Sequence, residues 1–184
     1  METLEAIAGR WSCRDFGERG VSDEDLRKIA RAGAQAPSGM NRQNWQIIVV
    51  RDRALIEELD KAGIEFMREW RKSGGHAPEP PSGGLFYHAP AMIYIAIKEA
   101  MPKGAELIDL GIVAQNICLA ATSLGVDNCH CGFAVFPFAG DRGEEFKARL
   151  KFPKGYECGM AVLLGYAVKV GKPHVADEKK ITVL

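Results

Sequence analysis

The sequence predicts a layered fold of mixed helices and strands, α+β or α/β, and three observations support that expectation. Short apolar segments with strand character alternate along the chain with helical segments. One of them, PAMIYIAIK, is apolar throughout, which is typical of a central strand whose two faces are both covered. The helical segments carry apolar stripes that suit such covering layers. No domain boundary is visible, so we expect one domain over residues 1–184.

The composition is that of an ordinary globular protein. The chain has 184 residues, 47% of them hydrophobic and 26% charged, and its 24 Lys and Arg balance 24 Asp and Glu. A nucleic-acid or membrane-surface protein normally shows a basic excess, so we expect neither partner. We find no apolar run of transmembrane length and no signal peptide. Five cysteines, an odd number, indicate reduced thiols and a cytoplasmic location.

The N-terminal part is expected to run through helix, extended chain, helix and strand. A first helix should cover about residues 3–9 with Thr3 as its N-cap, and RWSCRDF should follow as extended chain. VSDEDLRKIARAGAQAP predicts a second helix with Ser22 as N-cap and Pro37 at its end. SGMNRQN then forms a loop before the short strand WQIIVV.

The remaining chain continues this alternation. RALIEELDKAGIEFMREWRKS predicts a long amphipathic helix. GGHAPEPPSGG, residues 74–84, predicts a mobile surface loop because of its glycines and prolines. After PAMIYIAIK and an apolar helix, VDNCHCGFAVF is expected as a third strand, RGEEFKARL as a short helix and CGMAVLLGYAV as a fourth strand.

The apolar helix, over residues 106–124, has almost no polar face. Such a helix must be buried on every side, which in a chain of this size suggests that a second subunit covers part of it. Four small residues would let another helix approach closely: Gly111, Ala114, Ala120 and Ala121.

The stretch GRWSCRDF sets Arg10, Ser12 and Arg14 at every second position. In an extended segment these three side chains share one face, and Trp11 and Cys13 share the other. Two guanidinium groups on one face repel each other unless an anion lies between them, and a phosphate suits both. Two solvated surface arginines are the simpler interpretation of this motif alone.

The usual catalytic and nucleotide-binding motifs are missing. There is no G-x-G-x-x-G, P-loop, H-E-x-x-H or G-x-S-x-G. Cys129 and Cys131 share a strand face, but packed thiols explain them better than a metal site, which needs more ligands. If the protein is an enzyme, a cofactor is therefore expected to supply the reactivity.

A second polar cluster, APSGMNRQNW, precedes the first strand. Ser38, Gly39, Asn41 and Gln43 offer hydroxyl, backbone and amide groups that can bind the edge of a heterocycle. An ordinary helix-to-strand turn uses the same residue types, so this loop is ambiguous by itself.

In this order and spacing, the two clusters resemble the FMN-dependent nitroreductase family. The R-x-S-x-R pattern is followed by PSGMNRQNW, which is similar to the family's P-S-S-x-N-x-Q-P-W loop. DLGIVAQNICLAATSLGV resembles the family's dimer helix, and VLLGYA resembles its last core strand. The chain departs from the pattern at Gly39, which replaces a serine, and at Asn44, which replaces a proline.

The resemblance implies an α+β fold with three layers (α/β/α), a central, mostly antiparallel sheet flanked by helices, and an intertwined homodimer. Two FMN sites would lie at the dimer interface, with Arg10, Ser12 and Arg14 binding phosphate or the polar edge of the flavin. The remaining implied contacts are Pro37, Ser38, Gly39, Asn41 and Gln43 from the other subunit, Cys131 and Gly132 against the isoalloxazine, and Lys180, or alternatively Lys179, at the phosphate.

The same resemblance implies an oxidoreductase that uses NAD(P)H to reduce a nitroaromatic, a quinone or another electron-poor small molecule by a ping-pong mechanism. The flavin N5 would carry the hydride, and the loop at 74–84 would form a wall of the acceptor site. Two alternatives stay open: a reductive dehalogenase or flavin-destroying enzyme on the same fold, and a non-catalytic module that stores or senses FMN. Consumption of NAD(P)H separates the storage module from the enzymes.

Overall fold

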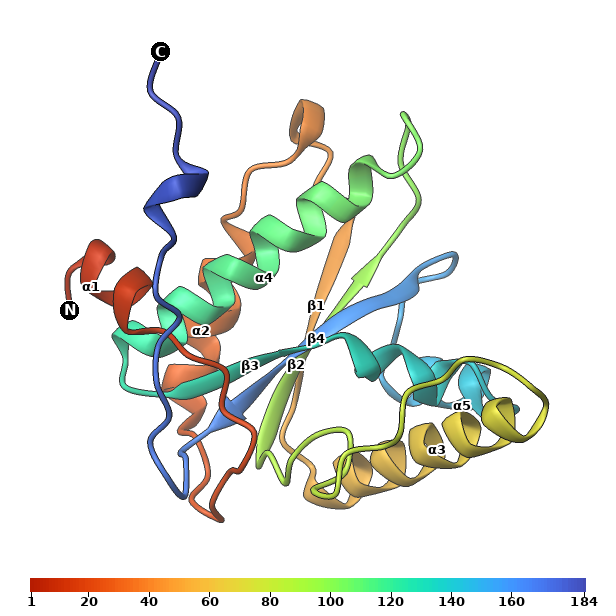
Figure 1. The fold of residues 1–184 in the computed structure, drawn as a ribbon. Coiled ribbons are helices and arrows are strands. Elements are labelled where there is room, and N and C mark those ends of the chain that lie inside the picture. Colours follow the sequence, from red (N-terminus) through yellow and green to blue (C-terminus); the bar gives the residue numbers. More distant parts are fainter.

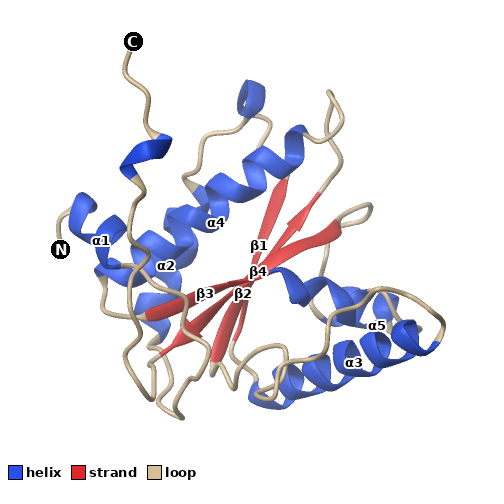
Figure 2. Ribbon diagram, in the orientation of Figure 1, coloured by secondary structure: helices blue, strands red, loops and turns tan.

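The computed structural model describes all 184 residues and arranges them in three layers, with a sheet between two layers of helices (Figure 1). Figure 2 shows the helices gathered on the two sides of the strands. One layer contains α1 (Thr3–Gly9), α2 (Asp23–Ala34) and α4 (Ala105–Ser123), and the other contains α3 (Arg53–Lys72) and α5 (Gly143–Arg149). The predicted three-layer α+β fold is confirmed.

The sheet is antiparallel at every pairing. Its strands are β1 (Trp45–Val50), β2 (Ala91–Ile97), β3 (Asp127–Cys131) and β4 (Glu157–Gly165), in the spatial order β1-β2-β4-β3. The continuously apolar segment is therefore central, as predicted, and every residue of β2 before Ile97 is buried. Strand β3 lies at an edge, so one of its sides is available to other segments.

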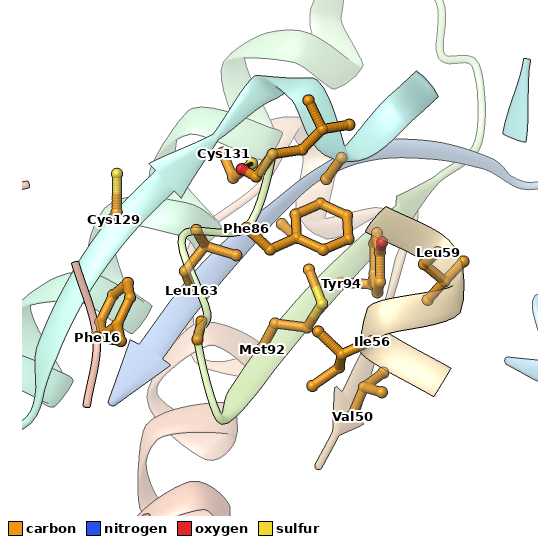
Figure 3. Close-up of a cluster of buried hydrophobic side chains, with 14 of the residues drawn as sticks. Phe16, Val50, Ile56, Leu59, Phe86, Met92, Tyr94, Cys129, Cys131 and Leu163 are labelled. Carbon is orange, nitrogen blue, oxygen red and sulfur yellow. Dashed lines mark hydrogen bonds between the residues drawn. The ribbon is translucent and has the colours of Figure 1, made fainter. Parts of the chain in front are cut away.

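Each face of the sheet has its own hydrophobic core. Figure 3 shows Phe86, Met92 and Tyr94 meeting Ile56 and Leu59 of α3 on one face. The other core joins the sheet to α2 and α4 through Ile29, Ile93, Ile117 and Val162. A Cβ on Gly33 would come 2.6 Å from Ile117, so α2 and α4 approach as closely as a glycine allows.

Two predicted starts of helices have different outcomes. Ser22 caps α2 as predicted, because its Oγ accepts a hydrogen bond from Asp25 N at 3.1 Å. The prediction of Thr3 as the cap of α1 is wrong, because Thr3 is the first helical residue and Glu2 is the cap. Glu5 reaches back to accept from Glu2 N at 3.1 Å, which makes a reciprocal capping box.

The third strand is shorter than predicted. It ends at Cys131, and Gly132–Phe138 form the 3₁₀ helix η2. Pro137 lies inside that segment and has no N–H for a strand ladder, while its fixed φ suits a helical turn. Gly132 therefore stands directly at the end of the sheet.

Helix α4 and the C-terminal tail keep apolar side chains exposed. Leu107 and Ile108 on α4 are 60% and 68% exposed. By length and composition α4 is apolar enough to cross a membrane, which corrects the expectation that no segment is, although core helices pass the same test. The tail carries exposed Val175 and Ile181, and its end stands clear of the other elements (Figure 1).

Candidate functional site

The segment Arg10–Arg14, called the arginine motif below, runs along the free edge of β3. Arg10 is extended, with φ −64° and ψ 135°, and ends α1. Ser12 forms a parallel bridge with Asn128, and Cys13 N donates to Asn128 O at 2.9 Å. The motif therefore continues the sheet for a few residues, which fixes the direction of its side chains.

Arg10, Trp11 and Ser12 are all half-buried, and only Cys13 and Arg14 show the alternation of burial that an extended segment predicts. Cys13 is completely buried and Trp11 is packed against the core, whereas Arg14 is exposed. Trp11 also contacts the start of the tail, where a Cβ on Gly171 would come 2.2 Å from its ring.

Neighbouring segments hold the motif from both sides. Beyond Arg14, Phe16 N donates to Tyr87 O at 3.2 Å, and Gly17 N donates to Tyr166 O at 2.8 Å. Val168 N donates to Asp15 O at 3.1 Å. These bonds join the motif to the turn before β2 and to the chain after β4.

Arg10 and Arg14 have no ion-pair partner within the chain. Six other arginines do bond to protein oxygens: Arg42, Arg51, Arg53, Arg71, Arg142 and Arg149. Burial raises the pKa of the Cys129 thiol, and the charges of Arg14 and Arg10 oppose that rise. Burial also lowers the pKa of His130, and Arg10 lowers it further. The face is thus positively charged and suits an anion.

The end of β3 offers an open stretch of backbone beside this face. Nothing lies within 4 Å of the position that a Cβ on Gly132 would occupy, so a flat ring can approach the main chain there. The Cys131 side chain points the other way, into the core, with Sγ 3.4 Å from Leu85 O. Burial raises the pKa of Cys131 to about 12, so this thiol stays protonated and is no nucleophile at neutral pH.

The polar loop before β1 is folded on itself. Ser38 Oγ accepts from Gln43 N at 2.9 Å, and Gln43 Nε2 donates to Asn41 Oδ1 at 2.9 Å. Pro37 is exposed. Met40, Asn41 and Gln43 adopt left-handed φ values of 56°, 54° and 50°, and such strain in non-glycine residues concentrates at functional sites.

An aspartate on α4 anchors this loop. Gly39 N donates to Asp109 Oδ1 at 3.2 Å, and Asp109 is one of the two buried polar or charged residues of the chain. Asn128, the other, donates to Cys118 O at 3.2 Å and to Thr122 Oγ1 at 3.0 Å, which ties the arginine motif to the far end of α4. The sequence prediction missed both anchors.

One chain does not bring the predicted site residues together. From Asp109, beside the loop, to Thr122, beside the arginine motif, α4 rises about 20 Å. Figure 1 shows the loop and the motif at opposite ends of α4. Lys179 and Lys180 lie in the short 3₁₀ helix η3 of the exposed tail, where Asp177 caps the turn and no contact with the arginines is formed.

Comparison with known proteins identifies the family. The model of the nitroreductase family matches residues 7–166. A protein of Methanothermobacter thermautotrophicus, provisionally named NADH dehydrogenase/NAD(P)H nitroreductase, is 30% identical over 168 residues, which cover 90% of this chain and 78% of the relative.

Two solved structures of nitroreductases with bound FMN have the same fold. The one from Desulfitobacterium hafniense is 44% identical, with a TM-score of 0.87 over 100% of this chain and 99% of that one. The one from Bacteroides fragilis is 25% identical, with a TM-score of 0.85 over the same shares. With its fold, its arginine motif and a family match over most of its length, the chain belongs to the nitroreductase family.

Proposed function

We propose that the protein is an FMN-dependent oxidoreductase that uses NAD(P)H to reduce an electron-poor small molecule such as a nitroaromatic or a quinone. The observation that carries the proposal is the unpaired face of Arg10, Ser12 and Arg14 beside the open backbone at Gly132. The FMN held by the Desulfitobacterium structure and the NAD(P)H nitroreductase named in the archaeal relative support it.

The residues present fit FMN by charge and by shape. Arg10 and Arg14 would offset the dianionic phosphate or bind the polar edge of the ring, with Ser12 donating a further hydrogen bond. The backbone of Cys131 and Gly132 would lie against the ring, where the structure leaves room. Asn41 and Gln43 would bind the heterocycle with the amide groups that their mutual hydrogen bond leaves free.

A homodimer would complete this site. Leu107, Ile108 and Gly111 are exposed together near the start of α4 and form an apolar surface that a second α4 would cover. If the two α4 helices pack antiparallel about a twofold axis, the loop at 37–43 of one copy meets the arginine motif of the other. The exposed tail would then reach the partner and carry Lys180, or Lys179, to the phosphate.

The protein's own contribution to the reaction is binding, orientation and charge. FMN, when bound, would supply the hydride-transfer chemistry between NAD(P)H and the acceptor. The thiols of Cys129 and Cys131 stay protonated because burial raises the pKa of both, so they take no part as bases. Because the chain has no second nucleotide motif, both reactants would use one site in turn, which predicts ping-pong kinetics.

The loop at 74–84 is the candidate wall of the acceptor site. We propose that the loop at 74–84 forms a movable wall of the acceptor site within a single domain over 1–184. Arg71 of α3 binds this loop through a half-buried hydrogen bond to Ala77 O at 3.2 Å and an ion pair with Glu79 at 2.9 Å, and the ion pair is solvent-exposed and therefore weak. The five free cysteines fit the reducing cytoplasm.

The absorbance spectrum of the purified protein tests this proposal. We expect a bound flavin that heat releases and chromatography identifies as FMN, and oxidation of NAD(P)H when an electron-poor acceptor is added. A protein that holds no FMN and takes none up on titration would contradict the proposal. FMN binding without NAD(P)H oxidation would favour the storage module instead.

A further inference from the structure

A cavity of about 600 Å³ opens between α3 and the turn before β2. One face of α3 forms its first wall, with side chains at three- and four-residue spacing: Arg53, Ile56, Glu57, Asp60 and Lys61. The facing wall comes from the turn at 83–90 and from the chain just after the arginine motif. None of the candidate FMN-binding residues lines this cavity, so the proposed function leaves it without a role.

The floor of the cavity is apolar. Phe16, Ile56 and Phe86 line it, and each is at most 4% exposed because it belongs to the hydrophobic core between α3 and the sheet (Figure 3). Side chains in a packed core are held in place by their neighbours, so this floor is already formed in the free protein. It can therefore receive the apolar body of a small organic molecule, which is the usual occupant of a pocket of this size.

Asp60 is the one charged side chain of the cavity wall that is half-buried rather than exposed. Its Oδ1 accepts from Phe86 N at 3.0 Å, and it forms no ion pair within the chain. A Cβ on Gly84, at φ 75°, would come 2.5 Å from Asp60 Oδ2, so a glycine is needed for the turn to close on this carboxylate. Burial raises the pKa of Asp60, and its backbone hydrogen bonds and the charges of His88 and Lys61 offset that rise only in part.

The charges at the rim of the cavity largely cancel. Four exposed side chains carry two charges of each sign: Glu18, Glu57, Arg53 and Lys61. The Arg53 guanidinium is already engaged, because it donates to Glu18 O, and His88 adds an exposed imidazole. Water screens such exposed groups, whereas the half-buried Asp60 acts on a ligand through less solvent. A molecule that enters over the apolar floor therefore meets an uncompensated negative charge.

We propose that this cavity binds a small organic cation, an amine with an apolar body, whose ammonium group forms a charge-assisted hydrogen bond with Asp60. The body of the amine would displace water from Phe16, Ile56 and Phe86, and its charge would supply the partner that the chain does not give Asp60. An anionic ligand would instead place a like charge beside Asp60, which is unfavourable. This second ligand site does not depend on the proposed FMN site.

Three probes with a phenyl body and different charges test the proposal. They are phenethylamine, 2-phenylethanol and 3-phenylpropionate, each titrated calorimetrically into the full-length protein at pH 8. We expect the amine to bind about tenfold more tightly than the alcohol, because only the amine makes a hydrogen bond between two charged groups. The propionate should bind more weakly than the alcohol. Equal affinities for amine and alcohol, tighter binding of the propionate, or no binding of the amine would each overturn the proposal.

Asp60→Asn tests where the amine binds. Its side-chain oxygen can still accept from Phe86 N but carries no charge, so the Kd for phenethylamine should rise about tenfold while the Kd for 2-phenylethanol stays unchanged. Glu57→Gln is the matched control, because it removes an exposed carboxylate from the rim of the same cavity, and it should change the Kd for the amine less than about twofold. Melting temperatures show whether each variant keeps its fold.

The variants can contradict the site even where the amine binds. An Asp60→Asn protein that binds phenethylamine as tightly as wild type overturns the proposal, and so does an equal loss of affinity from Glu57→Gln. Displacement of FMN by phenethylamine also overturns it, because the amine would then occupy the proposed FMN site. The three probes on the wild-type protein decide the question even if Asp60→Asn does not fold.

Discussion

Arg14 is the residue on which the proposed FMN site depends most directly, because it is exposed and has no carboxylate partner. We expect Arg14→Ala to weaken FMN binding by about 1.5–3 kcal/mol, the range for a hydrogen bond to a charged group. Arg14→Lys should also lose affinity because it removes the planar fork. Calorimetric titration would measure both. Arg68→Ala, an exposed arginine of α3, is the control, and equal affinities for the Arg14 and Arg68 variants would contradict the site.

Asp60 gives a prediction for the pH dependence of stability. Burial raises the pKa of Asp60 above its usual value, so the folded state binds its proton more tightly than the unfolded chain does. Stability is therefore lost as the pH rises through this raised pKa. Asp60→Asn can still accept from Phe86 N without becoming charged, so its stability relative to wild type should increase as the pH rises from the usual aspartate pKa through the raised pKa of Asp60.

Urea unfolding at each pH measures this difference. Asp141→Asn changes an exposed carboxylate that forms no hydrogen bond in the chain, and it should show no such trend. A relative stability of Asp60→Asn that falls as the pH rises would contradict the argument.

The predictability of single residues from the sequence depended on how local their partners are. The shared face of Arg10, Ser12 and Arg14 follows from the period of an extended chain and needs no distant partner. Asp109 was missed because its contact is with Gly39, 70 residues away in the sequence. The left-handed φ values of Met40, Asn41 and Gln43 cannot be read from a sequence that offers a glycine nearby.

At the scale of elements, Asn128 connects β3, α4 and the arginine motif. Its side chain donates to Cys118 O and Thr122 Oγ1, and its backbone pairs with Cys13. Asn128→Ala should lower the free energy of unfolding by about 1–3 kcal/mol, because it leaves buried acceptors without a donor. Asn116→Ala, which loses one half-buried bond to Ala32 O, should cost less. Thermal and urea unfolding would rank the two, and a larger loss for Asn116→Ala would contradict this role.

Element types followed from the sequence more reliably than element ends. The apolar run of β2 and the acidic start of α2 each point to one structure, and both predictions are confirmed. The predicted third strand failed beyond Cys131 because Phe and Val favour strands while Pro137 favours the helical turn that the packing selects. Because β3 ends at Cys131, Gly132 is exposed at the candidate site, so the wrongly predicted strand end lies within that site.

At the scale of the whole molecule, the dimer is the central expectation. Ile108 is 68% exposed in the single chain, so Ile108→Glu leaves the monomer core intact but puts a charge into the proposed interface. We expect this variant to sediment as a monomer and to lose FMN at the same time. Ala139→Glu, exposed in the opposite layer, should stay dimeric and keep FMN. An Ile108→Glu monomer that retains FMN would contradict a shared site.

The layers of the molecule were predictable from the sequence pattern, whereas the division of the site between two subunits was implied only by the family resemblance and stays a prediction. A helix without a polar face predicts that some of its apolar side chains stay exposed in a single chain, and Leu107 and Ile108 are exposed. The loop lies at the N-terminal end of α4 because Gly39 bonds to Asp109, and the arginine motif lies at the C-terminal end because Asn128 bonds to Cys118. Both contacts join residues that only the tertiary fold brings together.

A mixed dimer tests the shared site most directly. One subunit carries Arg14→Ala, the other carries Asn41→Ala with Gln43→Ala, and two different affinity tags isolate the mixed species. If each site takes its arginines from one subunit and its loop from the other, one of the two sites is intact and the other is doubly impaired. FMN titration should then show one site of wild-type affinity per mixed dimer, although neither homodimer has any. A mixed dimer with no site of wild-type affinity would contradict the account.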